Sequence, residues 1–209
     1  MDLHQTRTLA AQIIDGLRAL HRMEMFHQDL KPGNILIDHQ GTVKLIDFGS
    51  TRVTGMEEIT SKIDKRVPQG TLDYAAPECL NGAASTAASD LYSLGIILYE
   101  MLTGKLPYGE RDRPDQKKRL RYQSARRYNP GVPVWVDKAL EKAVHPLSTK
   151  RYNTLSEFQY DSSHPNPALK EISELPLLER NPQLFWQYLS ALLLLLNVLL
   201  LFLLASPNA

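Results

Sequence analysis

Residues 27–34 read His27-Gln28-Asp29-Leu30-Lys31-Pro32-Gly33-Asn34, and with Asp47-Phe48-Gly49 and Ala76-Pro77-Glu78 they decide the fold. Two short, mainly apolar runs, residues 35–37 and 43–46, lie between the first two motifs and are separated by polar residues. This pattern predicts a β-hairpin. Because Asn34 precedes the first strand and Asp47 follows the second, the hairpin should bring these two residues near each other.

Apolar side chains at helical spacing surround these motifs. They recur every three or four residues in two stretches, at Ala10, Ile13, Leu17 and Leu20 and again at Leu91, Leu94, Leu98 and Met101. The spacing predicts helices over residues 7–23 and 87–103. A further helix is expected after Pro133, a favoured first-turn residue. Residues 49–75 show little periodicity and are expected to form a long loop.

The motifs resemble those of the eukaryotic-type protein kinases, whose H-R-D-L-x-x-x-N, D-F-G and A-P-E sequences occur in the same order. The resemblance covers roughly residues 5–160. It implies a mainly α fold over residues 1–160, the large C-terminal lobe of a kinase domain with a small β-hairpin. Lys31 stands two residues after Asp29, where the serine/threonine kinases of this family have a similar lysine. The implied reaction transfers the γ-phosphoryl group of ATP to serine or threonine hydroxyls of protein substrates, with ATP and Mg²⁺ as cofactors.

The resemblance also implies a role for each residue of the site. Asp29 would orient the substrate hydroxyl and accept its proton, and Lys31 would place an ammonium group beside the transferred phosphoryl group of the nucleotide. Asn34 and Asp47 are the implied metal ligands. Their amide and carboxylate oxygens are the hard ligands that Mg²⁺ prefers.

Four residues have implied structural roles. Thr71 is similar to a threonine that hydrogen-bonds near the catalytic aspartate and lysine. Asp90 is similar to a buried aspartate that holds the backbone of the catalytic loop, and Arg151 to an arginine that pairs with the glutamate of A-P-E, here Glu78.

Two positions in the first motif receive separate interpretations. Gln28 stands where the family often has an arginine that clamps a phosphorylated activation loop through charge-assisted hydrogen bonds. Glutamine cannot do this comparably, so we expect activity that does not depend on phosphorylation of residues 50–75. His27 is expected to be a packed structural histidine, because the reaction gives it no role.

The 209 residues contain no counterpart of the small N-terminal kinase lobe. No G-x-G-x-x-G loop and no V-A-I-K lysine precede residue 7. We therefore expect a chain that looks truncated and that binds ATP poorly by itself. A non-catalytic, kinase-like scaffold that binds partners at the membrane is the alternative hypothesis.

The C-terminal region has a different composition. Leu184–Ala205 comprises 22 residues in which the only polar ones are Gln187, Ser190 and Asn197. At ~1.5 Å per residue this helix would reach ~33 Å, enough to cross a hydrocarbon layer of ~30 Å. We predict a Pro-rich juxtamembrane linker over residues 161–183, a transmembrane helix in the lipid bilayer over 184–205, and a short external tail over 206–209. A buried soluble helix is the other interpretation of the apolar segment.

The charge pattern predicts the orientation of this span. Lys170 and Arg180 precede it and no basic residue follows. The positive-inside rule then places the kinase portion in the cytoplasm, on a single-pass protein of the cytoplasmic (inner) membrane. This arrangement is similar to that of bacterial membrane-anchored kinases, some of which are fused to a metal-dependent protein phosphatase.

Overall composition limits the possible partners. Lys and Arg number 24 and Asp and Glu 23, so the net charge of +1 gives no reason to expect a nucleic-acid partner.

Residues 105–127 contain nine basic and three acidic residues. Such a stretch is usually a solvated face, and a membrane-surface adaptor is a weaker third hypothesis. Cys79 is the only cysteine, which excludes an intrachain disulfide and favours a reducing, intracellular setting.

Overall fold

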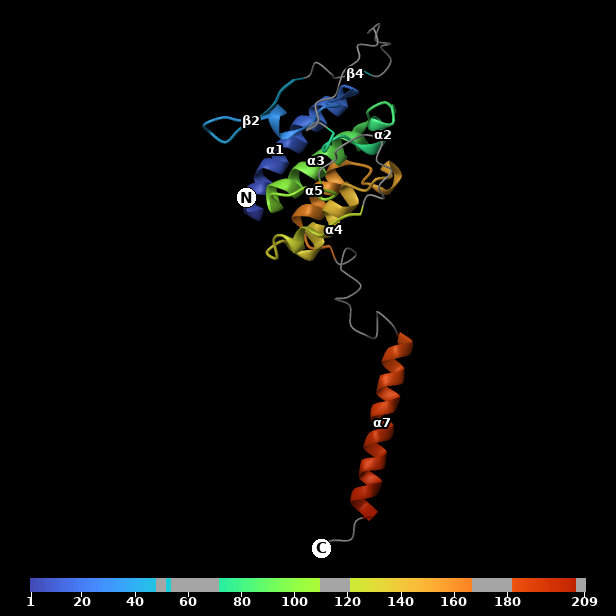
Figure 1. Cartoon of the computed structure of the whole chain (residues 1–209). Coiled ribbons are helices and arrows are strands. Elements are labelled where there is room, and N and C mark those ends of the chain that lie inside the picture. Colours follow the sequence, from blue (N-terminus) through green and yellow to red (C-terminus); the bar gives the residue numbers. More distant parts are fainter. Residues whose placement is uncertain (48–51, 54–71, 110–120, 167–181, 206–209) are drawn as a thin grey trace. The chain divides into compact units, whose positions relative to one another are not determined.

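The computed structural model describes residues 1–47, 52–53, 72–109, 121–166 and 182–205 (Figure 1). The chain divides into two compact units, residues 1–169 and 170–209. The first unit carries the motifs, and the second consists mainly of the apolar C-terminal helix.

Helix α1 spans Leu3–Arg22 and begins four residues earlier than the apolar spacing predicts. The reason is a capping box, in which the Asp2 carboxylate accepts a hydrogen bond from the Gln5 backbone N–H at 2.7 Å. The Gln5 side chain in turn accepts from the Asp2 backbone N–H. This reciprocal arrangement satisfies two N–H groups that the helix itself cannot pair.

Four short strands form two antiparallel pairs in the described part of the chain. β2 (Ile35–Ile37) pairs with β3 (Val43–Leu45), which confirms the predicted hairpin. β1 (Met25–Phe26) pairs with β4 (Arg52–Val53). The prediction of continuous loop over 49–75 was therefore wrong at β4, because a two-residue strand has no periodicity to detect. Residues 54–71 of that predicted loop lie outside the described residues.

Helix α3 spans Ala87–Thr103, the range predicted from the leucine spacing. Thr86 and Ser89 form its capping box, and Gly104 ends it with a left-handed φ of 66°. Glycine adopts this conformation without the steric cost that a Cβ atom would add.

The other helices of the first unit are shorter. α2 (Pro77–Leu80) contains the Pro-Glu of the third motif, and α4 (Val134–Ala143) begins directly after Pro133 as predicted. α5 (Leu155–Ser163) was not predicted and continues into the range expected to be linker. The structure also has three 3₁₀ turns in its described residues, η1 (Pro32–Asn34), η4 (Ala125–Arg127) and η5 (Ser148–Lys150).

The hydrophobic core of the first unit is built around α3. This helix is buried along most of its length and packs against α1 and α4, while α5 packs against α1 and α4 (Figure 1). Ile13 and Leu17 of α1, Leu94 of α3 and Phe158 of α5 are almost completely buried in one cluster. Residues 27–34 follow α1, and the Pro-Glu of the third motif lies in α2, so both are held next to this helical core.

The second unit contains α7, which spans Pro182–Ala205 and covers the apolar segment predicted to be helical. Within the described residues, no helix has both the length and the hydropathy of a membrane span. The transmembrane assignment stays a prediction.

Candidate active site

The loop of residues 27–34 is anchored by a buried carboxylate. Asp90, in the first turn of α3, is 1% exposed. Its Oδ2 accepts a hydrogen bond from the His27 backbone N–H at 2.9 Å, and its Oδ1 accepts from the Gln28 N–H at 3.1 Å. These charge-assisted bonds offset the cost of burying the carboxylate. They also hold the backbone immediately before Asp29, with Gln28 at a left-handed φ of 67°.

Three of the predicted site residues converge within this loop. The Lys31 Nζ lies 2.7 Å from Oδ2 of Asp29. The Asn34 Nδ2 donates to the Asp29 carbonyl oxygen at 2.8 Å and lies 3.3 Å from Oδ2 of Asp29. Since the amide nitrogen of Asn34 faces Asp29, its amide oxygen is the atom that could contact a cation.

The hairpin connects Asn34 to Asp47, as the sequence predicted. The Ile46 N–H donates to the Asn34 carbonyl oxygen at 3.0 Å, one step beyond the last paired residues of β2 and β3. Asp47 follows directly, with an exposed side chain and a left-handed φ of 64°. Outside glycine, this conformation costs ~1–2 kcal/mol and often marks a functional position.

The oxygens of Asn34 and Asp47 fit Mg²⁺, which favours hard oxygen donors. No group of three or more His, Cys, Asp or Glu side chains able to hold a metal occurs among the described residues. Mg²⁺ usually takes its remaining ligands from water and from substrate phosphates, and a cation held by Asn34 and Asp47 would do the same.

The third motif is fixed by a bidentate ion pair. The two terminal nitrogens of Arg151 lie 2.6 and 2.7 Å from the two carboxylate oxygens of Glu78. The Arg151 side chain has no exposed surface, and its guanidinium group lies over the ring of Tyr92 at 4.7 Å. It also donates to the carbonyl oxygens of Ala88 and His145. Thr71 lies outside the described residues.

The chain just before Glu78 is tied to α3 as well. The Tyr74 hydroxyl donates to Glu100 Oε2 at 2.6 Å, and the Ser93 hydroxyl donates to the Tyr74 carbonyl oxygen at 2.9 Å. Burial and the neighbouring Glu100 carboxylate raise the pKa of Tyr74 well above its usual value. The hydroxyl therefore stays protonated, and keeps its role as a donor, to a higher pH than that of an exposed tyrosine would.

Two histidines border the catalytic loop. His27 has no exposed surface, which agrees with its interpretation as a packed residue. Sequence reasoning missed His21, whose Nε2 lies 2.9 Å from Oδ2 of Asp90. Its position in the last turn of α1 gave no signal, because the contact spans 69 residues of chain.

The helical lobe thus presents an aspartate, a lysine and an asparagine on one anchored loop, and a hairpin leads from that loop to Asp47. The family model for the protein kinase domain matches residues 1–160. The chain belongs to the protein kinase family.

Several curated relatives are serine/threonine kinases. The chain is 37% identical over 153 residues to the serine/threonine-protein kinase PrkC of Bacillus subtilis, an alignment covering 72% of this chain and 23% of the relative. It is 37% identical over 156 residues to the probable serine/threonine-protein kinase PknB of Bifidobacterium longum, with 71% and 22% covered. A yeast relative, serine/threonine-protein kinase YPK1 of Saccharomyces cerevisiae, is 40% identical over 119 residues, with 57% and 17% covered. The chain thus spans less than a quarter of the length of these relatives.

Proposed function

We propose that residues 1–160 are the large lobe of a serine/threonine protein kinase that uses Mg-ATP. The observation that carries this proposal is the convergence of Lys31 and Asn34 on Asp29, at 2.7 and 2.8 Å, in a loop anchored by Asp90. The serine/threonine kinases among the relatives support the same class of reaction.

Each residue contributes through its position and charge. The Asp29 carboxylate orients the acceptor hydroxyl and takes its proton. The Lys31 ammonium group neutralises negative charge on the phosphoryl group during its transfer. The ion pair between Lys31 and Asp29 holds the ammonium group next to the Asp29 carboxylate. The Asn34 amide oxygen and the Asp47 carboxylate hold the cation. Bound Mg-ATP would supply the phosphoryl group and most of the charge neutralisation.

Replacing the two acidic residues tests this assignment. In a polypeptide in which a kinase small lobe precedes Met1, we expect Asp29→Asn and Asp47→Asn each to lower phosphate transfer at least ~100-fold, because positioned proton acceptors and metal ligands act in the transition state. The measurement is phosphate incorporation from labelled ATP into a protein substrate. Asp38→Asn, the same change in the turn of the hairpin, is the matched control and should keep wild-type activity. Wild-type rates of phosphate transfer in both Asp29→Asn and Asp47→Asn would contradict the proposed roles of these residues.

We also propose that the 209 residues alone bind Mg-ATP weakly and transfer little phosphate. They contain no Gly-rich loop to cover the phosphates and no V-A-I-K lysine to hold them. Calorimetric titration of the detergent-solubilised chain with Mg-ATP is the measurement, and a micromolar dissociation constant would contradict the proposal. If the chain binds no nucleotide but captures protein partners with Asp29 and Asp47 both replaced, the scaffold hypothesis gains support.

We propose that residues 184–205 anchor the protein in the cytoplasmic membrane, with the kinase portion in the cytoplasm. The support is compositional: the segment is 22 residues long and no charged residue follows Arg180. Mixed polar and apolar faces would be needed to pack such a helix on a soluble protein.

Two measurements test the anchor. The protein should stay with membranes in alkaline carbonate, whereas a surface-adsorbed protein would be released. In intact spheroplasts, a cysteine introduced by Ser206→Cys should react with a membrane-impermeant thiol reagent, and the native Cys79 should not. Labelling of Cys79 in sealed cells, or loss of the protein to the carbonate wash, would contradict the proposal.

A further inference from the structure

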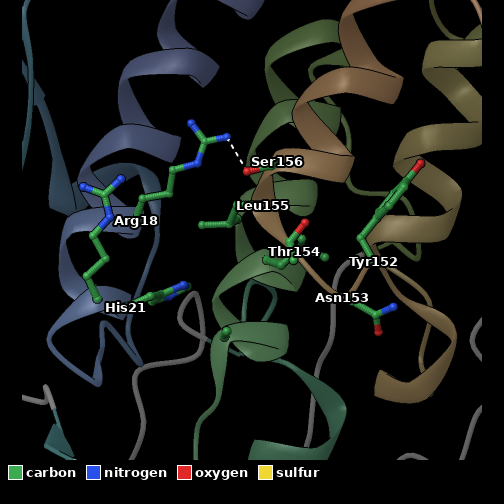
Figure 2. A pocket seen from close by; sticks show the side chains of 10 residues that line it. Arg18, His21, Tyr152, Asn153, Thr154, Leu155 and Ser156 are labelled. Carbon is green, nitrogen blue, oxygen red and sulfur yellow. Dashed lines mark hydrogen bonds between the residues drawn. The ribbon is translucent and has the colours of Figure 1, made fainter.

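A pocket of about 640 Å³ lies between the end of α1 and the start of α5, and none of the residues proposed for phosphoryl transfer lines it. Figure 2 shows Arg18 and His21 on one side and Asn153, Thr154 and Ser156 on the other. The volume lies within the range of typical small-ligand sites, ~300–1,000 Å³.

The lining of this pocket is basic and rich in hydrogen-bonding groups. Arg18 and Arg22 are one helical turn apart, so both side chains lie on the same face of α1. No acidic side chain occurs among the ten described residues that line the pocket. Such a lining attracts an anion.

One guanidinium group is already fixed at the wall of the pocket. Arg18 donates to Ser156 Oγ at 2.8 Å (Figure 2). It also donates to Gln159 Oε1 at 2.7 Å, so little side-chain freedom remains to be lost when a ligand binds. Arg22, by contrast, is exposed and could close on the ligand. An arginine that is held in place before binding lowers the entropic cost of association.

Among the described residues, four acidic side chains contact residues that line the pocket without lining it themselves. They are Asp15, Asp90, Glu157, which accepts from the Asn153 N–H at 3.3 Å, and Asp161, which accepts from the Tyr152 hydroxyl at 2.9 Å. Asp15 pairs with Arg18 at 3.1 Å, but its side chain is 71% exposed and the pair is screened by water. Asp90 lies next to His21, but its carboxylate is already bound by two backbone N–H groups of the catalytic loop. Arg22 forms an ion pair with neither Asp15 nor Asp90 in the structure.

We propose that this pocket binds a phosphate monoester dianion, either a phosphorylated serine or threonine side chain of a protein or a small phosphorylated molecule. A dianion with three terminal oxygens uses two guanidinium groups together with the neutral donors opposite them, whereas a single carboxylate is satisfied by one arginine. The ligand would also contact His21, which joins the pocket to Asp90 and thereby to the loop that carries Asp29.

A binding titration of the intact 209-residue chain in detergent micelles tests the proposal. The probe is a fluorescein-labelled heptapeptide of alanines around one central phosphothreonine, followed by fluorescence anisotropy at low salt. We expect saturable binding that weakens at least ~10-fold in Arg22→Gln, which removes one charge-assisted contact. Asn153→Asp should weaken it similarly, because it places a negative charge in the lining without changing side-chain size.

Controls separate the pocket from general basicity and identify the source of the ligand. Lys105→Gln removes one exposed positive charge that does not line the pocket, and it should bind the probe like the wild type. O-phosphothreonine and inorganic phosphate are tested as competitors of the peptide. If they displace it at concentrations similar to its own, the ligand is a small phosphorylated molecule. If far higher concentrations are needed, the ligand is a phosphoprotein.

A second measurement locates the bound probe. The ring signals of His21 in an NMR spectrum should shift saturably with the phosphopeptide in the wild type and not in Asn153→Asp. Absence of saturable binding, equal affinities in Lys105→Gln and Arg22→Gln, or equal binding of the unphosphorylated peptide would overturn the proposal. These experiments measure binding and no catalysis, so a negative result leaves the proposed kinase activity unaffected. Loss of the proposed kinase activity would likewise leave the binding proposal unaffected.

Discussion

The burial of an arginine decides how much its ion pair contributes to the stability of the molecule. The Arg151 side chain is fully buried between Glu78 and Tyr92, so its charge has no access to water. The pair between Lys138 and Glu141 is a single contact of 2.8 Å, and its two side chains are 31% and 42% exposed. A buried, bidentate pair and an exposed pair should therefore differ strongly in energetic importance.

We predict that Glu78→Gln lowers the free energy of unfolding by about 3 kcal/mol, because it leaves a buried guanidinium group without a compensating charge. Glu141→Gln, the matched change at the exposed pair, should cost less than about 1 kcal/mol. Urea denaturation of the detergent-solubilised chain, followed by tryptophan fluorescence, measures both. Equal losses in the two variants would show that burial of Arg151 does not govern its contribution.

At the same scale, some site residues could be predicted from the sequence and others could not. The contact of Asn34 with Asp29 lies within one local motif, and the hairpin that leads from Asn34 to Asp47 was predictable from its two strands. The contact between His21 and Asp90 depends on how α1 crosses α3, which sequence spacing does not specify. The pocket beside α5 depends on the same kind of long-range packing.

At the scale of elements, a glycine sets the approach of α3 to α4. A Cβ atom added at Gly95 would lie 2.8 Å from Val144 Cγ1 and 3.1 Å from the Ala143 Cβ. In an exposed helix, replacing glycine by alanine stabilises the helix by about 1 kcal/mol. At Gly95 the steric conflict with the end of α4 should outweigh this gain.

We predict that Gly95→Ala destabilises the first unit by about 1–3 kcal/mol, since overpacking a closely packed core forces side chains from their preferred rotamers. Gly33→Ala is the control, because a Cβ atom there meets nothing within 4 Å. Thermal denaturation monitored by circular dichroism compares the two variants. A Gly95→Ala protein as stable as the wild type would mean that α4 shifts to accept the methyl group at no cost.

Some helices and strands can be predicted from the sequence more readily than others. α1 and α3 bury long apolar faces, so apolar residues every three or four positions revealed both. α5 buries only Leu155 and Phe158, too few to define a period. β1 and β4 have two residues each and exist only because they pair with each other. Such elements are specified by tertiary contacts rather than by local pattern.

For the first unit as a whole, buried and half-buried tyrosines link stability to alkaline pH. Burial is the main cause that raises the pKa values of Tyr74, Tyr99, Tyr122 and Tyr152 above their usual value of 10.0. For Tyr122 the neighbouring Asp137 carboxylate adds to the shift, and the Tyr122 hydroxyl donates to that carboxylate at 2.8 Å. The folded state therefore keeps protons on these groups at a pH where the unfolded chain releases them.

The sign of the pH dependence follows from this difference in proton binding. Below pH 10 the tyrosines are protonated in both states and their contribution to stability is complete. As the pH rises above 10, the unfolded state loses protons first, so the free energy of unfolding falls by up to ~1.4 kcal/mol per pH unit for each group. We predict a steep loss of stability between about pH 10 and pH 11.5. Urea denaturation at a series of pH values measures it.

Replacing single tyrosines separates this linkage from general alkaline damage. Tyr122→Phe removes one titrating hydroxyl together with its bond to Asp137, so we expect lower stability by about 1 kcal/mol at pH 8 but a shallower decline above pH 10. Tyr160→Phe is the control, because that side chain is 62% exposed, and it should decline like the wild type. Parallel pH profiles for Tyr122→Phe and the wild type would assign the alkaline loss to groups other than Tyr122. A shallower profile in Tyr122→Phe but not in Tyr160→Phe would show that release of the Tyr122 proton accounts for part of the alkaline loss of stability.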